Sequence, residues 1–363
     1  MATRINLFDI SNHDFYNEFL LKNKPCLIEE DVTTNWCCRQ LWVTKDGKPN
    51  LSYLKTHFGS SVAPVANCKI KHYNAQLTNN ITVNDFVDYW QQYIDSDYSD
   101  SIECRYLKDW HFQKEHPDYY AYSVPKFFTF DWLNEYCKSK TDDDYDFVYM
   151  GPKGSWTPFH ADVFRSHSWS ANVCGKKRWL LCPPGTEKKL TDSLGNLPYD
   201  LEEVKTQIPG LIDVLQGPGE IIFVPSNWHH QVYNLARIED TISINRNWFN
   251  GSNIDEVYNF LIKSLDEVRC EINDCKDMDG WDKQCQVILK VSQGMDFYDF
   301  YDLLKFVAHS RLTVCNEEDS DLNKFELFKL RETLKQFLLV ENLPDDLLSS
   351  IRSFQSFLNG KKE

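Results

Sequence analysis

A histidine and an aspartate stand two residues apart in the stretch Trp156–Asp162, which reads WTPFHAD. The stretch has the pattern of an extended strand, in which successive side chains point to opposite faces. His160 and Asp162 are therefore predicted to share one face. One imidazole and one carboxylate on a common face are two of the three ligands of a 2-His-1-carboxylate Fe(II) site. Such a site needs a second histidine from elsewhere in the chain.

Few of the ten histidines are candidates for that second imidazole. Five of them precede the region of short strands, His309 lies in a predicted helix, and His167 lies between a loop and a strand. His229 and His230 remain, directly after the stretch that ends at Trp228. Alternation places these two side chains on opposite faces of their strand, so spacing alone leaves both open.

An iron held by three such ligands keeps positions free for a bidentate 2-oxo acid and O2. The far carboxylate of 2-oxoglutarate then needs a cation. Lys177 is the candidate, because it lies on a predicted strand shortly after the first two ligands. Trp179 and Leu181 share its face, which predicts burial, and a buried ammonium is costly without an anion. The alternative is a lysine whose stem packs while its amine reaches solvent.

The region that must position these side chains begins near residue 147. Its apolar segments are short and end at Gly or Pro, which is typical of an antiparallel β-sandwich or barrel. Before it, residues 83–94 carry aromatic side chains at helical spacing, and residues 252–363 repeat apolar side chains at the same spacing. We therefore predict a mixed helical region over 1–140, a β core over 141–250 and a helical region over 251–363.

Composition narrows the classes of partner. The chain has 363 residues, of which 42% are hydrophobic, and a formal net charge of −15, which argues against a broad nucleic-acid or membrane-surface footprint. No apolar run reaches transmembrane length, and the first residues lack the apolar core of a signal peptide. The twelve cysteines are scattered without a CxxC pair, which indicates free thiols in a reducing compartment. We expect a cytoplasmic protein, and a nuclear location is equally compatible with these features.

Several longer stretches carry a family resemblance over roughly residues 5–250. They read YLKDWHF, PKFFTFDWLN, FVYMGPKGSWTPFHAD, HSWSANVCGKKRWLLCPPG, GEIIFVPSNWHHQVYN and DTISINRNW. In this order they resemble the JmjC family of Fe(II)- and 2-oxoglutarate-dependent oxygenases. The resemblance implies an α+β fold with a double-stranded β-helix core, also called a jelly-roll or cupin core. N-terminal helices and strands would support this core, and an all-helical region would follow it.

The resemblance also implies roles for individual residues. The metal ligands are His160, Asp162 and, as the histidine just before the x-Val-x-Asn pattern, His230. The lysine for 2-oxoglutarate is Lys177, seventeen residues after His160. Thr157, three residues before the first ligand, is a further co-substrate contact. Strict alternation turns Thr157 away from His160, and Pro158 between them predicts a bulge that re-aims it.

Four more positions are candidates for contacts to the co-substrate. Ser170 stands where related hydroxylases often have Asn, and Asn172, of the same strand parity, is a candidate for the missing amide. Asn245 lies in the last strand, where relatives have Thr. Tyr149 is a further candidate for the co-substrate carboxylate.

The resemblance is strongest to a branch of small hydroxylases that includes a lysyl hydroxylase of the eukaryotic translation termination factor. It implies oxidative decarboxylation of 2-oxoglutarate to succinate and CO2, coupled to hydroxylation of a substrate C–H bond, with Fe(II) as cofactor and O2 as co-substrate. Lysine demethylation on histones or other proteins by the same chemistry is the alternative activity. A non-catalytic cupin-like binding module is the alternative from another class. Homodimerisation through the C-terminal helices is a further expectation.

Overall fold

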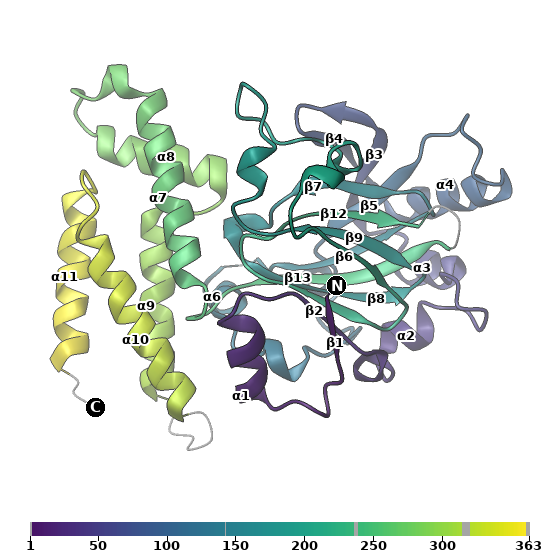
Figure 1. Ribbon diagram of the computed structural model, residues 1–363, viewed down its shortest axis with the longest axis horizontal. Coiled ribbons are helices and arrows are strands. Elements are labelled where there is room, and N and C mark those ends of the chain that lie inside the picture. The colour runs from purple at the N-terminus through teal and green to yellow at the C-terminus, as the bar shows by residue number, and fades with distance from the viewer. Residues whose placement is uncertain (1, 142, 236–238, 314–319, 361–363) are drawn as a thin grey trace. The chain divides into compact units, whose positions relative to one another are not determined.

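A computed structural model describes residues 2–141, 143–235, 239–313 and 320–360. The described chain forms two compact units (Figure 1). The first comprises residues 1–129, 143–162 and 167–247, and the second comprises 130–142, 163–166 and 248–363. No described helix combines the length and the apolar character needed to cross a membrane.

The first unit is built on two sheets. The larger has nine strands in the order β1-β2-β11-β8-β13-β6-β5-β3-β4, and the smaller has the order β10-β9-β12-β7. The strands are β1 (Thr3–Ile5), β2 (Cys26–Ile28), β3 (Val62–His72), β4 (Ala75–Thr82), β5 (Arg105–Trp110), β6 (Asp146–Gly151), β7 (Trp156–His160), β8 (His167–Cys174), β9 (Lys177–Cys182), β10 (Ile212–Gln216), β11 (Ile221–Val224), β12 (His229–Asn234) and β13 (Thr241–Trp248). Strand β1 pairs with β2 in parallel, whereas the pairings of β2 with β11, β11 with β8, β13 with β6, β6 with β5, β5 with β3 and β3 with β4, and those within the smaller sheet, are antiparallel.

The two sheets pack against each other through apolar side chains. One buried cluster takes Leu27 and Ile222 from the larger sheet and Trp179, Leu181 and Val232 from the smaller. Burying aliphatic and aromatic side chains of this size stabilises the unit by about 1.5–3 kcal/mol for each side chain. The α+β fold with a jelly-roll core, predicted from the sequence, is confirmed. Strands β1 to β5, from the predicted supporting region 1–140, extend the larger sheet of this core.

Short helices of the first unit are α1 (Asn12–Phe15), α2 (Cys37–Leu41), α3 (Leu51–Phe58), α4 (Val83–Asp95) and α5 (Phe112–Glu115). The helix predicted over 83–94 is α4. The Thr82 side chain caps its N-terminus by accepting a hydrogen bond from the Asp85 amide at 3.0 Å. Its buried face carries Phe86, Trp90 and Tyr93, so the aromatic stripe is core packing, as its spacing predicts.

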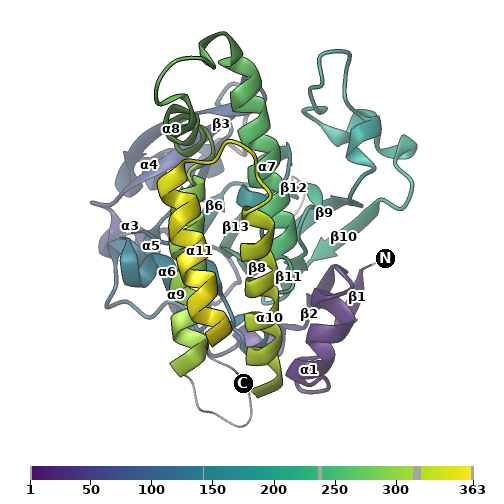
Figure 2. The same cartoon turned by 90° about the vertical axis from the view of Figure 1, so that its left-hand side faces the viewer.

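The second unit is helical. It contains α6 (Trp132–Lys140), α7 (Ile254–Glu271), α8 (Trp281–Gln293), α9 (Phe297–Thr313), α10 (Ser320–Phe337) and α11 (Asp345–Gly360). Helices α7, α9, α10 and α11 run alongside one another (Figure 2). The buried guanidinium of Arg311 on α9 binds Glu135 of α6 at 2.8 Å and Glu326 of α10 at 2.6 Å. This network explains why α6 belongs with the C-terminal helices. Dimerisation through these helices stays a prediction.

Candidate metal centre and co-substrate pocket

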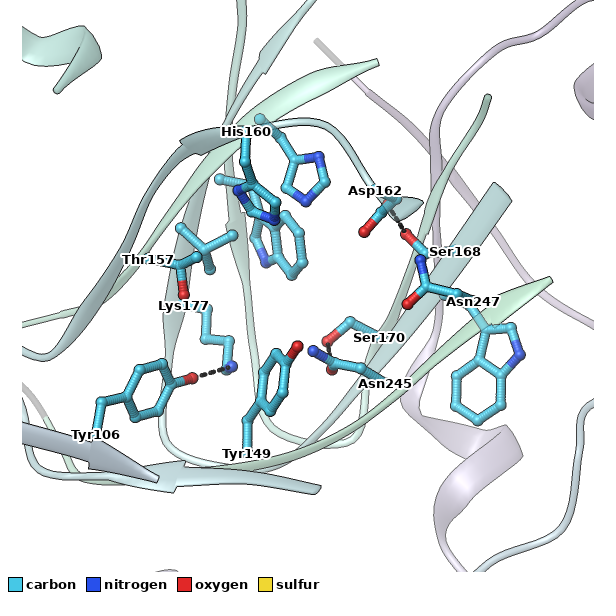
Figure 3. Close-up of a pocket in the computed structure, with 14 residues that line it drawn as sticks. Tyr106, Tyr149, Thr157, His160, Asp162, Ser168, Ser170, Lys177, Asn245 and Asn247 are labelled. Carbon is cyan, nitrogen blue, oxygen red and sulfur yellow. Dashed lines mark hydrogen bonds between the residues drawn. The ribbon is translucent and has the colours of Figure 1, made fainter. Parts of the chain in front are cut away.

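A pocket lies between the two sheets of the first unit (Figure 3). Its walls come from β5, β6, β7, β8, β9, β12 and β13. The lining residues are Tyr106, Tyr149, Thr157, His160, Asp162, Ser168, Trp169, Ser170, Lys177, Trp179, His230, Val232, Asn245 and Asn247. In Figure 3, His160 and Asp162 lie at one end of the pocket, and Lys177 and Tyr106 lie at the other.

The three predicted metal ligands meet at one end of this pocket. One ligand atom from each of His160, Asp162 and His230 lies within 4.8 Å of those from the other two. The two histidines face each other in the pairing of β7 with β12, and their ring centroids are 4.4 Å apart. Two imidazoles and a carboxylate at this spacing fit a divalent iron ion held on one face.

The main chain orients both imidazoles. The Nδ1 atom of His160 lies 2.8 Å from the carbonyl oxygen of Pro158, and that of His230 lies 3.0 Å from the carbonyl oxygen of Trp228. A carbonyl oxygen only accepts hydrogen bonds, so each Nδ1 carries the proton. Each Nε2 therefore presents a lone pair for a metal.

The charges of the ligand set suit a cation. Burial and the neighbouring His230 ring lower the pKa of His160 to about 4, so its imidazole is neutral at pH 7. Burial alone would raise the pKa of Asp162, but the two imidazoles and hydrogen bonds from Ser168 and Asn247 outweigh it, and this pKa lies below its ordinary value. The Ser168 hydroxyl donates to Asp162 Oδ2 at 2.7 Å. Neutral imidazoles and an ionised carboxylate are the protonation states in which these groups bind metal.

His229, the alternative third ligand, points elsewhere. Its ring packs on Phe159, with centroids 5.5 Å apart, and it does not line the pocket. Strand alternation separates it from His230, as predicted. The choice between the two depends on which face of β12 is turned toward the pocket. In the structure, His230 lies on that face.

The predicted bulge in β7 is present. His230 pairs with His160, and Val232, two residues further along β12, pairs with Thr157, three residues back along β7. One extra residue therefore lies in β7 between Thr157 and His160. It reverses the alternation, so both side chains line the same pocket.

Lys177 occupies the other end of the pocket. Its side chain is 1% exposed, so the alternative of an amine that reaches solvent is wrong. The amine donates a hydrogen bond to the Tyr106 hydroxyl at 3.1 Å (Figure 3). It donates a second to the Ser243 hydroxyl at 2.8 Å. Burial lowers the pKa of Lys177 to about 7. Among the described residues no carboxylate forms an ion pair with this amine, and an anionic ligand would supply the missing charge.

The remaining predicted contacts divide into two groups. Tyr149, Ser170 and Asn245 line the pocket, and the Ser170 hydroxyl donates to Asn245 Oδ1 at 2.6 Å. Asn172 does not line it. Its amide donates to the carbonyl oxygens of Gly175 at 2.7 Å and Gly217 at 3.2 Å, so this side chain holds two turns together.

Sequence reasoning missed several residues of the site. Ser168 and Asn247 each lie two residues from a predicted contact on the same strand, so alternation alone could have found them. Tyr106 and Ser243 reach Lys177 from β5 and β13, and no local pattern marks either residue. Both strands belong to the larger sheet, and they reach Lys177 on β9 because the larger sheet faces the smaller one.

A second group of possible ligands, His111, Asp143 and Asp144, lies outside the pocket. His111 Nδ1 lies 2.7 Å from Asp144 Oδ1, and this carboxylate raises the pKa of the imidazole. The amine of Lys114 lies 3.4 Å from Asp143 Oδ1. Because a lysine already supplies the cation, this group is an ion-pair cluster.

Comparisons with known proteins agree with this geometry. The family profile described as "Cupin-like domain" matches residues 12–254. The chain is 47% identical over 312 residues to 2-oxoglutarate and iron-dependent oxygenase JMJD4 of Gallus gallus, covering 83% of this chain and 73% of that protein. It is 45% identical over 315 residues to the protein of the same name from Homo sapiens, covering 84% and 75%. It is also 46% identical over 324 residues to arginine-specific demethylase JMJ20 of Arabidopsis thaliana, covering 82% and 68%.

The chain therefore belongs to the cupin-like JmjC family of 2-oxoglutarate and iron-dependent oxygenases. Its cofactor is Fe(II), and its co-substrates are 2-oxoglutarate and O2. The donor set at one end of the pocket and the buried ammonium at the other fit the metal and the co-substrate respectively.

Proposed function

We propose that this oxygenase is a protein hydroxylase that acts on a lysyl side chain, with the eukaryotic translation termination factor as its substrate and promotion of termination as its role. The observation that carries the hydroxylase chemistry is the meeting of His160, Asp162 and His230 in a pocket with a buried lysine. The substrate rests on the family branch that the sequence resembles. A net charge of −15 suits a basic peptide.

In this proposal each side chain has a defined task. His160, Asp162 and His230 hold the iron, which when bound supplies the redox chemistry that joins 2-oxoglutarate decarboxylation to C–H hydroxylation. Lys177 binds the far carboxylate of 2-oxoglutarate, and Tyr106 and Ser243 hold the amine in place. Trp179 and Val232 exclude water from the wall between the two ends.

The test is mass spectrometry of the purified termination factor after incubation with the enzyme, Fe(II), 2-oxoglutarate and O2. We expect a stable gain of one oxygen on a lysine, with an equal amount of succinate. His229→Ala is the matched control that should retain activity, and His160→Ala should lose it. An unmodified termination factor would reject this substrate.

Demethylation is the second candidate, because one relative is named an arginine-specific demethylase and a relative from Caenorhabditis elegans is named a bifunctional arginine demethylase and lysyl-hydroxylase. Methylated arginyl and lysyl peptides would then lose a methyl group and release formaldehyde. A binding module without turnover would bind 2-oxoglutarate and form no succinate with any of these substrates.

We also propose a cytoplasmic location. The eleven cysteines in the described part of the chain are free, and most are buried, which suits a reducing compartment. Fractionation of cells that express the tagged chain would test this, and enrichment in the nuclear fraction would contradict it.

A further inference from the structure

A strained acidic residue stands beside the pocket. Asp109 has a φ of 56°, in the left-handed region that residues other than glycine seldom adopt. It lies in an irregular part of β5, where Leu107 pairs with Met150 and Trp110 pairs with Val148. The two β5 residues are three positions apart in the chain, whereas their partners on β6 are only two positions apart. The extra residue lies between Leu107 and Trp110, and such insertions re-aim side chains next to active sites.

The Asp109 side chain reaches a residue of the pocket wall. Tyr149 lies on β6 between Met150 and Val148, opposite the irregularity, and its hydroxyl donates a hydrogen bond to Asp109 Oδ1. Burial and then the nearby Asp109 carboxylate hold the pKa of Tyr149 well above its ordinary value, and Asp162 adds to the effect. The Tyr149 hydroxyl thus stays protonated and within electrostatic reach of both carboxylates.

Asp109 is exposed, and in the described ranges of the chain no lysine, arginine or histidine forms an ion pair with it. Its carboxylate interacts electrostatically with one neighbouring cation, Lys108. The preceding residue, Lys108, directs its amine to Gln76 Oε1 at 3.1 Å. Asp109 is therefore an exposed anion, held beside the wall of an active-site pocket and open to a cation from outside the chain.

We propose that Asp109, together with the Tyr149 hydroxyl, receives the positively charged end of the substrate side chain. This assignment rests on the proposed function, because it takes the target to be a lysine. The carboxylate forms a charge-assisted hydrogen bond with the ammonium, which favours a charged side chain over a neutral one of similar length. The Tyr149 hydroxyl fixes the direction of the carboxylate.

The experiment compares overlapping synthetic peptides that span the termination factor, each made with lysine or with Nε-acetyl-lysine. The wild-type enzyme should prefer the lysyl form by about tenfold to a hundredfold in kcat/KM, the range expected for one hydrogen bond to a charged group. Asp109→Asn should remove most of this preference by raising the KM for the lysyl peptide. The KM for 2-oxoglutarate should stay unchanged. Asn tolerates the left-handed conformation, so the backbone is preserved.

Further variants separate recognition from structure. Asp109→Glu should restore part of the preference, and Tyr149→Phe should reduce it, because the carboxylate loses its hydrogen-bond donor. Asp97→Asn is the matched control: Asp97 is exposed, has a φ of 51° and does not line the pocket. Peptide affinity for the anaerobic complex of enzyme, Fe(II) and 2-oxoglutarate should change in the same order as the KM.

The outcomes distinguish this assignment from the proposed function. If the wild type hydroxylates lysyl and acetyl-lysyl peptides equally well, the hydroxylase stands and the role of Asp109 is wrong. The same holds if Asp109→Asn keeps the wild-type preference. If no peptide is hydroxylated by the wild type, the proposed function fails and the assignment of Asp109 fails with it.

Discussion

At the ligand end of the pocket, both imidazoles are oriented by main-chain carbonyls two residues earlier, whereas at the other end the Lys177 amine is held by hydroxyls from distant strands. The ligand end combines the neutral ring of His160 with an Asp162 carboxylate whose pKa lies below its ordinary value, and this combination suits a cation. The lysine end is a cation whose pKa is lowered to about 7 by burial. The two ends therefore require ligands of opposite charge, which explains how one pocket takes a metal ion and a dicarboxylate together.

The largest expected effect tests the ligand end. His160→Ala should abolish succinate formation and lower iron affinity by more than the roughly 10- to 100-fold lost when only a hydrogen-bonding neighbour of a ligand is removed. Succinate assays and iron titration measure the two effects. His229→Ala is the control, because its ring packs outside the pocket. Normal turnover by His160→Ala would show that the ligand assignment is wrong.

The lysine end should respond differently. Lys177→Met should raise the KM for 2-oxoglutarate by about thirtyfold or more, since removing one partner of a buried charge pair costs about 2–5 kcal/mol. Iron affinity in the absence of 2-oxoglutarate should stay unchanged. The neighbouring Lys176 is exposed, and Lys176→Met is the control for initial-rate kinetics. A parallel loss of iron affinity would contradict the separation of the two ends.

A smaller effect should follow from the support of Asp162. Ser168→Ala removes the hydroxyl that donates to Asp162 Oδ2, and the affinity for iron should fall by about tenfold. Ser170→Ala, two residues along the same strand, removes a hydroxyl bound to Asn245 and should leave iron affinity unchanged. Equal losses in the two variants, measured by anaerobic titration, would argue against a specific role for Ser168.

The smallest effect is a pH dependence of the lysine end. The pKa of Lys177 is lowered from an ordinary 10.5 to about 7, so the unfolded chain binds more protons between these values. Stability of the ligand-free enzyme should therefore rise with pH across this window, and the destabilisation should be present in full below pH 7. The difference in unfolding free energy between wild type and Lys177→Met isolates this contribution from other titrating groups.

The same titration should weaken co-substrate binding. 2-Oxoglutarate needs the protonated amine, whose fraction in the free enzyme falls roughly fivefold between pH 7 and pH 8 for a pKa near 7. Calorimetry should show weaker binding and proton uptake at pH 8. A wild-type affinity that does not change over this interval would show that Lys177 stays fully charged without the ligand.

Local patterns predicted the ligand end better than the lysine end. The spacing of His160 and Asp162 is a property of one strand, and alternation reduced the third ligand to two adjacent histidines. Choosing His230 required the family pattern, because the sequence does not mark which face of β12 is internal. Pro158 indicated the bulge that brings Thr157 to the pocket.

The rest depends on long-range pairing. Tyr106 lies 71 residues before Lys177, and Ser243 lies 66 residues after it. Their positions beside Lys177 follow from the order of strands in the larger sheet and from the packing of that sheet against the smaller one, which local periodicity does not encode. The prediction that Asn172 contacts the co-substrate was wrong for a related reason. Strand parity placed it on the same face as Ser170, but Asn172 lies near the end of its strand, where its amide binds the turns at Gly175 and Gly217.

The carbonyl oxygens of Pro158 and Trp228, which orient the two metal-binding imidazoles, affect how the sequence of this family can change during evolution. They belong to the main chain, so no side-chain replacement removes them while the two strands keep their conformation. Lineages that inherit these strands can accept many substitutions around the iron and still present the same two nitrogen lone pairs. The groups that we propose to lie beside the target side chain, Asp109 and Tyr149, are side chains that a single codon change can replace. Descendants of one ancestral enzyme can therefore retain the metal and exchange the substrate.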